Sequence, residues 1–277
     1  MSNPSLLRRL FGGLWKAITW LRLALTNLLF IAMLLIIYFV YLGGSPAPRP
    51  ERAALLLNPV GSIVDHTRPV EPLQALLGEP SPADHQVLVR VVIKAIELAA
   101  ADPAINSIVM ELDSLFRVGI SRSMEIAVAL EAFKAAGKPV VAVADFYTQD
   151  QYLLASHADE IITHPMGGVA LEGFGAYFNY FAEALEKLSV NVHVFRAGKF
   201  KSAVEPFTRN DMSPEEREVA QIWLDDLWAH YAAVVEEQRQ LPAGAVDSYV
   251  NGFAERMSAG GGDSAMDALQ ALSLIHI

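Results

Sequence analysis

Two lysines lie in apolar company within one stretch of the chain, residues 196–217, directly after a strand-like run and directly before a long helical pattern. The second of them, Lys201, has Phe200, Val204 and Phe207 as close neighbours in the sequence. An amine held among such groups loses hydration, which disfavours its charged form and lowers its pKa. We therefore expect Lys201 to act as a general base that takes a proton from a serine. The competing interpretation is an ordinary solvated lysine, since lysine is seldom fully buried.

Three longer motifs give this stretch a context. They are residues 195–207 (FRAGKFKSAVEPF), 211–217 (DMSPEER) and 152–161 (YLLASHADEI). The sequence resembles the membrane-anchored signal peptide peptidase A (protease IV) family in its long, internally duplicated form, from the anchor to about residue 270. The resemblance implies a Ser/Lys dyad whose base is the lysine before Ser-Ala-Val-Glu-Pro-Phe, here Lys201 and not Lys199. It also implies that the nucleophilic serine lies in a second, C-terminal half, which is missing from this chain.

The turn at residues 147–152 resembles the Ser-Gly-Gly-Tyr nucleophile turn of the family's catalytic half. Gln149 takes the place of the serine, and Asp150 and Gln151 replace the glycines. Thr148 is the alternative hydroxyl within this turn. We interpret the chain as the half that kept the base and lost the nucleophile.

Other residues around this chemistry have plainer interpretations. Ser156 lies in a helical pattern and is expected to be a packed hydroxyl, and Ser202 would point away from Lys201 in an extended backbone. Residues 113–119 lack the paired glycines of the family's oxyanion turn, so no oxyanion residue is assigned. Glu205 and Asp211 are expected to have structural roles. The methionines and aromatic residues at helical spacing, Met124, Met212, Tyr177, Phe178, Tyr180 and Phe181, are expected to pack in the core rather than line a peptide groove.

An apolar segment near the N-terminus predicts a membrane anchor. Residues 23–42 contain only Thr26 and Asn27 as polar members, and twenty such residues are long enough to cross a hydrocarbon layer of about 30 Å as a helix. A cleaved signal peptide is the alternative, but its apolar region is about 7–15 residues long. Four cations and no acidic residue precede the span, so the positive-inside bias places residues 1–22 in the cytoplasm.

The rest of the chain is acidic. With the four N-terminal cations set aside, 17 Lys+Arg face 31 Asp+Glu, an excess of 14 negative charges. This charge argues against a nucleic-acid partner. The chain has no cysteine and its 7 histidines show no zinc-protease spacing, so neither a metal nor a cofactor is expected.

Strand-like and helical patterns alternate after the anchor. Apolar strands are predicted at 53–57, 107–112, 139–144, 160–163 and 190–195, and helices at 87–101, 121–136, 149–158, 177–188, 213–240, 243–252 and 263–272. A polar, proline-bearing loop is expected to run to about residue 84. This order predicts an α/β fold with a mostly parallel sheet covered on both sides. The resemblance sharpens it to the repeated β-β-α units of the ClpP/crotonase superfamily, preceded by one transmembrane helix.

The predicted organisation is a cytoplasmic segment 1–22, an anchor 23–42, a proline-rich linker 43–52, a peptidase-family domain 53–272 and a tail 273–277. The tail offers no strand that would pair locally, so we expect it to mark a truncation.

The leading hypothesis is a membrane-anchored serine endopeptidase of the bacterial inner membrane that degrades cleaved, apolar signal peptides on the periplasmic side. The resemblance implies a homo-oligomer, a tetramer. A non-catalytic assembly module is the main alternative, and a crotonase-type acyl-thioester enzyme is a weaker one.

Overall fold

The computed structural model describes residues 6–41, 51–68 and 85–276. The chain divides into two units, Met1–Glu51 and Arg52–Ile277, which are considered separately. Most of the expected linker, residues 43–50, and the greater part of the expected polar loop, residues 69–84, lie outside the described residues.

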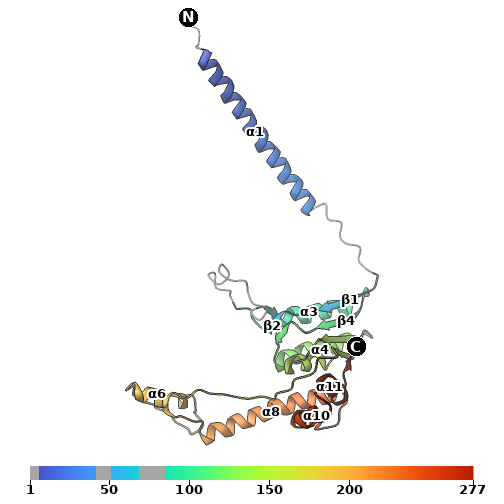
Figure 1. Ribbon diagram of the computed structural model, residues 1–277, viewed down its shortest axis with the longest axis vertical. Coiled ribbons are helices and arrows are strands. Elements are labelled where there is room, and N and C mark those ends of the chain that lie inside the picture. Colours follow the sequence, from blue (N-terminus) through green and yellow to red (C-terminus); the bar gives the residue numbers. More distant parts are fainter. Residues whose placement is uncertain (1–5, 42–50, 69–84, 277) are drawn as a thin grey trace. The chain divides into compact units, whose positions relative to one another are not determined.

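The first unit contains one long helix, α1 (Leu6–Tyr41), and Figure 1 shows it as a single rod. An 18-residue window within its stretch Phe11–Val40 has a mean hydropathy of 2.6, and none of that window is buried. Among the described residues it is the one helix long and apolar enough to cross a membrane. The expected apolar helix is therefore present, but it begins well before residue 23, because residues 6–22 contain no proline and are mostly good helix formers despite Gly12 and Gly13.

The second unit is built on two parallel sheets. The larger has the strand order β1 (Ala53–Leu57), β4 (Ile105–Glu111), β6 (Val140–Ala144), β7 (Glu160–Thr163) and β8 (Ile275–His276). The smaller has the order β3 (Gln86–Leu88), β2 (Gly61–Val64) and β5 (Leu115–Arg117). Every pairing between these strands is parallel, so the predicted α/β class with parallel sheets is confirmed.

The β-β-α unit recurs along the chain. β4 belongs to the larger sheet, β5 to the smaller one, and α4 (Ile120–Ala135) follows them. β1 and β2 stand in the same relation, with β3 between them and α3 (Val89–Ala101). After β6, a bridge between Tyr147 and Val169 takes the second strand's place before α5 (Gln149–Ala155). The sequence reading missed β2, β3 and β5 because strands of three or four residues are stabilised by their neighbours rather than by their own pattern.

The core lies between the larger sheet and these helices. Val140, Ala142 and Ala144 of β6 are at most 1% exposed, and Leu130 and Phe133 of α4 are fully buried. Burial of this kind contributes about 1.5–3 kcal/mol for each large apolar side chain. β6 and α4 are therefore held firmly, and so are the starting points of the turns that follow them.

Four helices end the chain: α8 (Pro214–Gln238), α9 (Ala245–Asn251), α10 (Phe253–Ala259) and α11 (Ser264–Ala271). They lead back to the larger sheet, where β8 pairs with β7. The Tyr152 hydroxyl donates to Leu272 O at 2.7 Å, and Arg239 Nη2 donates to Ser273 O at 2.7 Å. The tail pairs with no strand close to it in the sequence; its partner β7 lies about a hundred residues earlier, where a local pattern cannot reveal it.

The segment between β7 and α8 also departs from expectation. The predicted helix 177–188 shortens to α6 (Ala182–Lys187), and the predicted strand 190–195 does not form. An extended run becomes a strand only when a neighbour supplies ladder hydrogen bonds, and the described residues place none beside it.

Candidate active site

Residues 174–212, called the arm below, leave the body of the second unit and return to the start of α8. In Figure 1 the arm extends away from the sheets and carries α6 far from them. Its outgoing and returning parts are joined by hydrogen bonds from Phe181 N to Pro206 O at 2.6 Å and from Glu183 N to Asn210 Oδ1 at 3.0 Å. Lys201 lies on the returning part, just ahead of α7 (Glu205–Thr208).

Lys201 is exposed, so the predicted burial of its amine was wrong for this chain. Its apolar neighbours Phe200 and Phe207 are themselves 50% and 49% exposed. Of the aromatic residues expected in the core, Tyr177, Phe178 and Phe181 are exposed, most of all Tyr177 at 97%, and Tyr180 is half-buried. Apolar sequence neighbours desolvate an amine only when a further surface encloses them, and the described residues provide none at the arm.

The backbone at Lys201 is nevertheless fixed. Arg196 Nη1 donates to Lys201 O at 3.1 Å and lies 3.8 Å from Glu205 Oε1. Glu205 is 2% exposed, and its Oε2 accepts a hydrogen bond from Ser213 N at 3.1 Å. Burial opposes ionisation of Glu205, but the hydrogen bonds from Ser213 and the cations Arg209 and Arg196 outweigh it and hold the pKa of Glu205 below its ordinary value. These contacts join Glu205 to the start of α8 and to Arg196, which is the kind of structural role expected for it.

The start of α8 fixes the returning end of the arm. Ser213 Oγ accepts from Glu216 N at 3.1 Å, and Pro214 is the first helical residue, as the sequence predicted. Asp211 accepts a hydrogen bond from Arg209 at 2.7 Å immediately before this cap. The arm therefore ends on a capped helix.

The turn at residues 147–152, which resembles a nucleophile turn in sequence, lies at the N-terminus of α5. Gln149 Oε1 accepts from Glu172 N at 3.0 Å and Gly173 N at 2.8 Å, and its Nε2 donates to Gly173 O at 3.1 Å. Thr148 forms a capping box with Gln151. The amide of Gln149 thus ties α5 to the root of the arm, and the hydroxyl of Thr148 caps the helix.

Asp150 occupies the neighbouring backbone donors. Its Oδ2 accepts from Val118 N at 3.0 Å and Gly119 N at 3.1 Å, at the junction between β5 and α4. Two converging N–H groups of this kind are what an oxyanion hole needs. Here a carboxylate of the same chain takes both, a pairing that sequence reasoning missed because Asp150 and Gly119 lie 31 residues apart.

The hydroxyl of Ser156 is packed, as expected: it is 1% exposed and donates to Leu153 O at 2.7 Å. Ser202 instead offers its carbonyl, which accepts from Glu205 N at 2.8 Å and opens α7.

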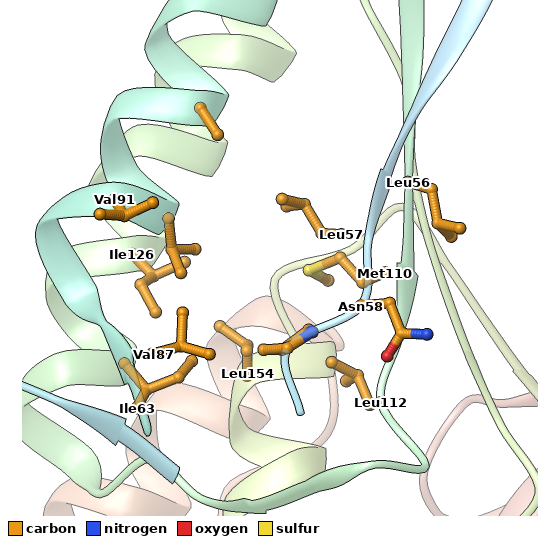
Figure 2. Close-up of a pocket in the computed structure, with 13 residues that line it drawn as sticks. Leu56, Leu57, Asn58, Ile63, Val87, Val91, Met110, Leu112, Ile126 and Leu154 are labelled. Atoms are coloured by element: carbon orange, nitrogen blue, oxygen red, sulfur yellow. The ribbon is translucent and has the colours of Figure 1, made fainter. Parts of the chain in front are cut away.

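A cavity of about 190 Å³ lies among β1, α3, β4 and α4. Figure 2 shows that its labelled walls are aliphatic, including Leu57, Ile63, Val87 and Met110, with Asn58 as the polar side chain among them. None of its lining residues comes from the arm. The cavity therefore offers apolar contact but no acid–base chemistry.

A groove of about 470 Å³ lies between the start of α4 and α8. Met124, Trp223 and Leu227 line it, together with Ile120, which directly follows Gly119. Met124 thus lines a groove rather than the closed core. As for metals, no group of three His, Asp or Glu side chains gathers as ligands within residues 6–41, 51–68 and 85–276.

Comparison with known proteins gives this geometry a family context. Residues 132–261 match the family model described as Peptidase family S49. The chain is 35% identical over 266 residues to "Protease 4" of Salmonella typhi, covering 94% of this chain and 43% of that protein. It is 38% identical over 235 residues to "Protease 4" of Haemophilus influenzae, covering 82% of this chain and 38% of that protein. The chain thus spans about two fifths of the length of these curated relatives.

Among solved structures, an enoyl-CoA hydratase from Bacillus halodurans is similar at 12% identity, with 65% of this chain and 83% of that chain covered and a TM-score of 0.25. A likeness at that level carries no weight for the function of this chain.

Proposed function

This chain belongs to peptidase family S49. On that basis we propose that it is one half of a membrane-anchored serine endopeptidase that degrades cleaved signal peptides, the half that supplies the general base. Lys201 is the general base in this proposal, and a serine outside residues 1–277 is the nucleophile. The observation that carries it is the exposed Lys201 on an arm whose aromatic side chains are also exposed.

A lysine acts as a base only in its neutral form, which contact with water disfavours and enclosure by apolar groups favours. Enclosure of the arm by the rest of the protein would desolvate both Lys201 and the half-exposed Phe200 and Phe207. The neutral amine would then take the proton of the serine hydroxyl as it attacks the peptide carbonyl, and would return that proton to the departing amine. In this proposal the site is therefore incomplete in residues 1–277 and is completed when the rest of the protein encloses the arm.

The turn at Thr148–Gln151 supports a nucleophile located elsewhere. Gln149 has no nucleophilic atom suited to acyl transfer, and the two donors that would bind an oxyanion are taken by Asp150. We expect residues 1–277 alone to show no peptidase activity.

The substrate and compartment follow from the anchor. α1 is apolar along Phe11–Val40, and the cations ahead of residue 23 favour a cytoplasmic N-terminus. The second unit then lies on the periplasmic face of the bacterial inner membrane, where cleaved signal peptides remain. The groove lined by Met124, Trp223 and Leu227 offers the apolar walls that such peptides need.

Association of several copies is part of the proposal, because exposed aromatic residues such as Tyr177 and Phe195 require a covering surface. A homo-oligomer, a tetramer, would enclose the arms.

A non-catalytic assembly module is the second candidate. It is favoured by the N–H groups of Val118 and Gly119, which already donate to Asp150. In this half, the turn at the start of α5 makes structural hydrogen bonds in place of catalytic ones. The two candidates differ in what Lys201 does, because a module has no use for a base at that position.

The deciding experiment substitutes Lys201→Met in the complete gene product and measures turnover of an apolar peptide together with the melting temperature. Loss of the base should lower activity by at least about 10²–10⁴-fold while folding is retained, since methionine keeps the apolar stem. Lys199→Met is the matched control and should leave activity within a few-fold. An active Lys201→Met variant, or an inactive Lys199→Met variant, would overturn the assignment of the base.

A further inference from the structure

The loop from Arg196 to Lys201 is closed by a side chain rather than by backbone pairing. Arg196 Nη1 spans the loop and donates to Lys201 O at 3.1 Å. Gly198 lies inside the loop with φ +99°, a conformation that an L-residue with a side chain rarely adopts. The loop can therefore turn tightly enough for one guanidinium to join its two ends.

The same guanidinium nitrogen has a second neighbour, which is itself fixed. Glu205 is buried, lies 3.8 Å from Arg196 Nη1 through Oε1, and is held by Ser213 N through Oε2. Ser213 in turn caps α8, the long helix that packs on the body of the unit. A continuous path of contacts thus runs from α8 through Glu205 and Arg196 to the backbone of Lys201.

This path has no evident purpose in folding the body of the unit. The Arg196 side chain is 43% exposed, and both its hydrogen bond to Lys201 and its ion pair with Glu205 stay within the arm. A guanidinium is suited to such a task because its planar group presents several donors in a fixed geometry. What the contacts achieve is a defined position for the Lys201 backbone on an otherwise open arm.

We propose that Arg196 and Glu205 are positioning residues for Lys201: the buried carboxylate orients the guanidinium, and the guanidinium sets where the lysine backbone stands when the site is assembled. This inference rests on the proposed role of Lys201 as the base. A general base must lie within hydrogen-bond reach of the proton it takes, and a misplacement of about 1 Å costs about 10²-fold in rate.

Arg209 provides a matched control. It lies on the same arm, its side chain is 40% exposed against 43% for Arg196, and its cation also acts on Glu205. Its hydrogen bonds go to Asp211, at 2.7 Å to Oδ1 and 3.2 Å to the carbonyl oxygen, and not to Lys201. Removal of either arginine takes one positive charge from the arm, but only one removal releases the lysine backbone.

The experiment uses the complete gene product and measures kcat, KM and melting temperature with an apolar peptide substrate. Arg196→Ala should lower kcat by about 10–100-fold with KM nearly unchanged. Arg196→Lys should recover a large part of that loss, since an ammonium can still donate to Lys201 O. Arg209→Ala should stay within about two-fold of the wild type. A kcat for Arg196→Ala equal to that of Arg209→Ala would overturn the inference, and so would a loss that appears in KM alone.

A double variant separates this inference from the proposed function. Arg196→Ala added to Lys201→Met should cost nothing further, because a positioning residue acts only through the group that it positions. A full additional loss in the double variant would contradict the positioning role while leaving Lys201 as the base. If Lys201→Met is itself active, the proposed function fails, whatever Arg196 does.

Discussion

At the scale of single residues, ionised side chains hold segments of the backbone in place through hydrogen bonds. Glu205 and Asp150 each accept backbone N–H groups through a carboxylate, and neither faces the apolar cavity. Hydrogen bonds to an ionised acceptor contribute about 1.5–3 kcal/mol, against about 0.5–1.5 kcal/mol for neutral pairs. Such residues hold loops in place where little apolar surface is buried.

Glu205 makes the stability of the arm depend on pH. Because its folded pKa is lowered from 4.5, the ionised form is favoured by folding, so its contribution is present above about pH 4.5 and is lost as the pH falls through the lower folded value. Glu205→Gln keeps an acceptor for Ser213 N but removes the charge. We expect the melting temperature of this variant to lie about 2–4 °C below the wild type at pH 7, the shift that about 1 kcal/mol causes in a domain of this size.

The two melting temperatures should converge as the pH is lowered from about 5 to 3, because protonation then removes the same charge from the wild type. Thermal scans by circular dichroism at several pH values measure this difference. A gap that stays constant down to pH 3 would show that the charge of Glu205 is not the source of the effect.

At the scale of elements, the turn at the start of α5 joins three parts of the fold. Asp150 binds the β5–α4 junction, Gln149 binds residues 172–173 at the root of the arm, and the Tyr231 hydroxyl of α8 donates to Gln149 O at 3.1 Å. The turn that resembles a nucleophile turn in sequence is thus a connecting point between elements.

Substitution of Asp150 tests this connecting role. Asp150→Ala leaves the N–H groups of Val118 and Gly119 without their acceptor, so we expect a loss of about 1–3 kcal/mol in the free energy of unfolding. Asp150→Asn keeps one acceptor oxygen and should lose less. Urea denaturation followed by tryptophan fluorescence measures both values. Asp226→Ala, at an exposed position on α8, is the control and should change stability by no more than about 0.5 kcal/mol. Equal losses for the alanine variants at 150 and 226 would refute the role.

At the scale of the whole molecule, the chain combines an apolar helix, an acidic second unit and an arm with exposed aromatic side chains. The helix and the arm can bury their exposed apolar side chains only against a membrane or another protein surface. The helix suits a bilayer, and the aromatic residues of the arm suit a protein surface that encloses them.

The orientation of the anchor is open to a direct test. The cations before residue 23 and the absence of acidic residues before Glu51 predict that a reporter fused after Glu51 is exported. Alkaline phosphatase fused there should be active and β-galactosidase inactive, and removal of the four cations should weaken that preference. The reverse pattern would place the second unit in the cytoplasm, away from cleaved signal peptides.

The sequence by itself determined the long apolar helix, the alternation of strands and helices, the Ser213 cap and the family motif around Lys201. These features depend on composition and on spacing within one element, so each can be recognised without its neighbours. Only the tertiary structure decided the pairing of β8 with β7, the capture of the Val118 and Gly119 donors by Asp150, and the link from Glu205 through Arg196 to Lys201. The exposure of Lys201 belongs to the same group, because burial depends on which surfaces meet in space and not on which residues are adjacent in the chain.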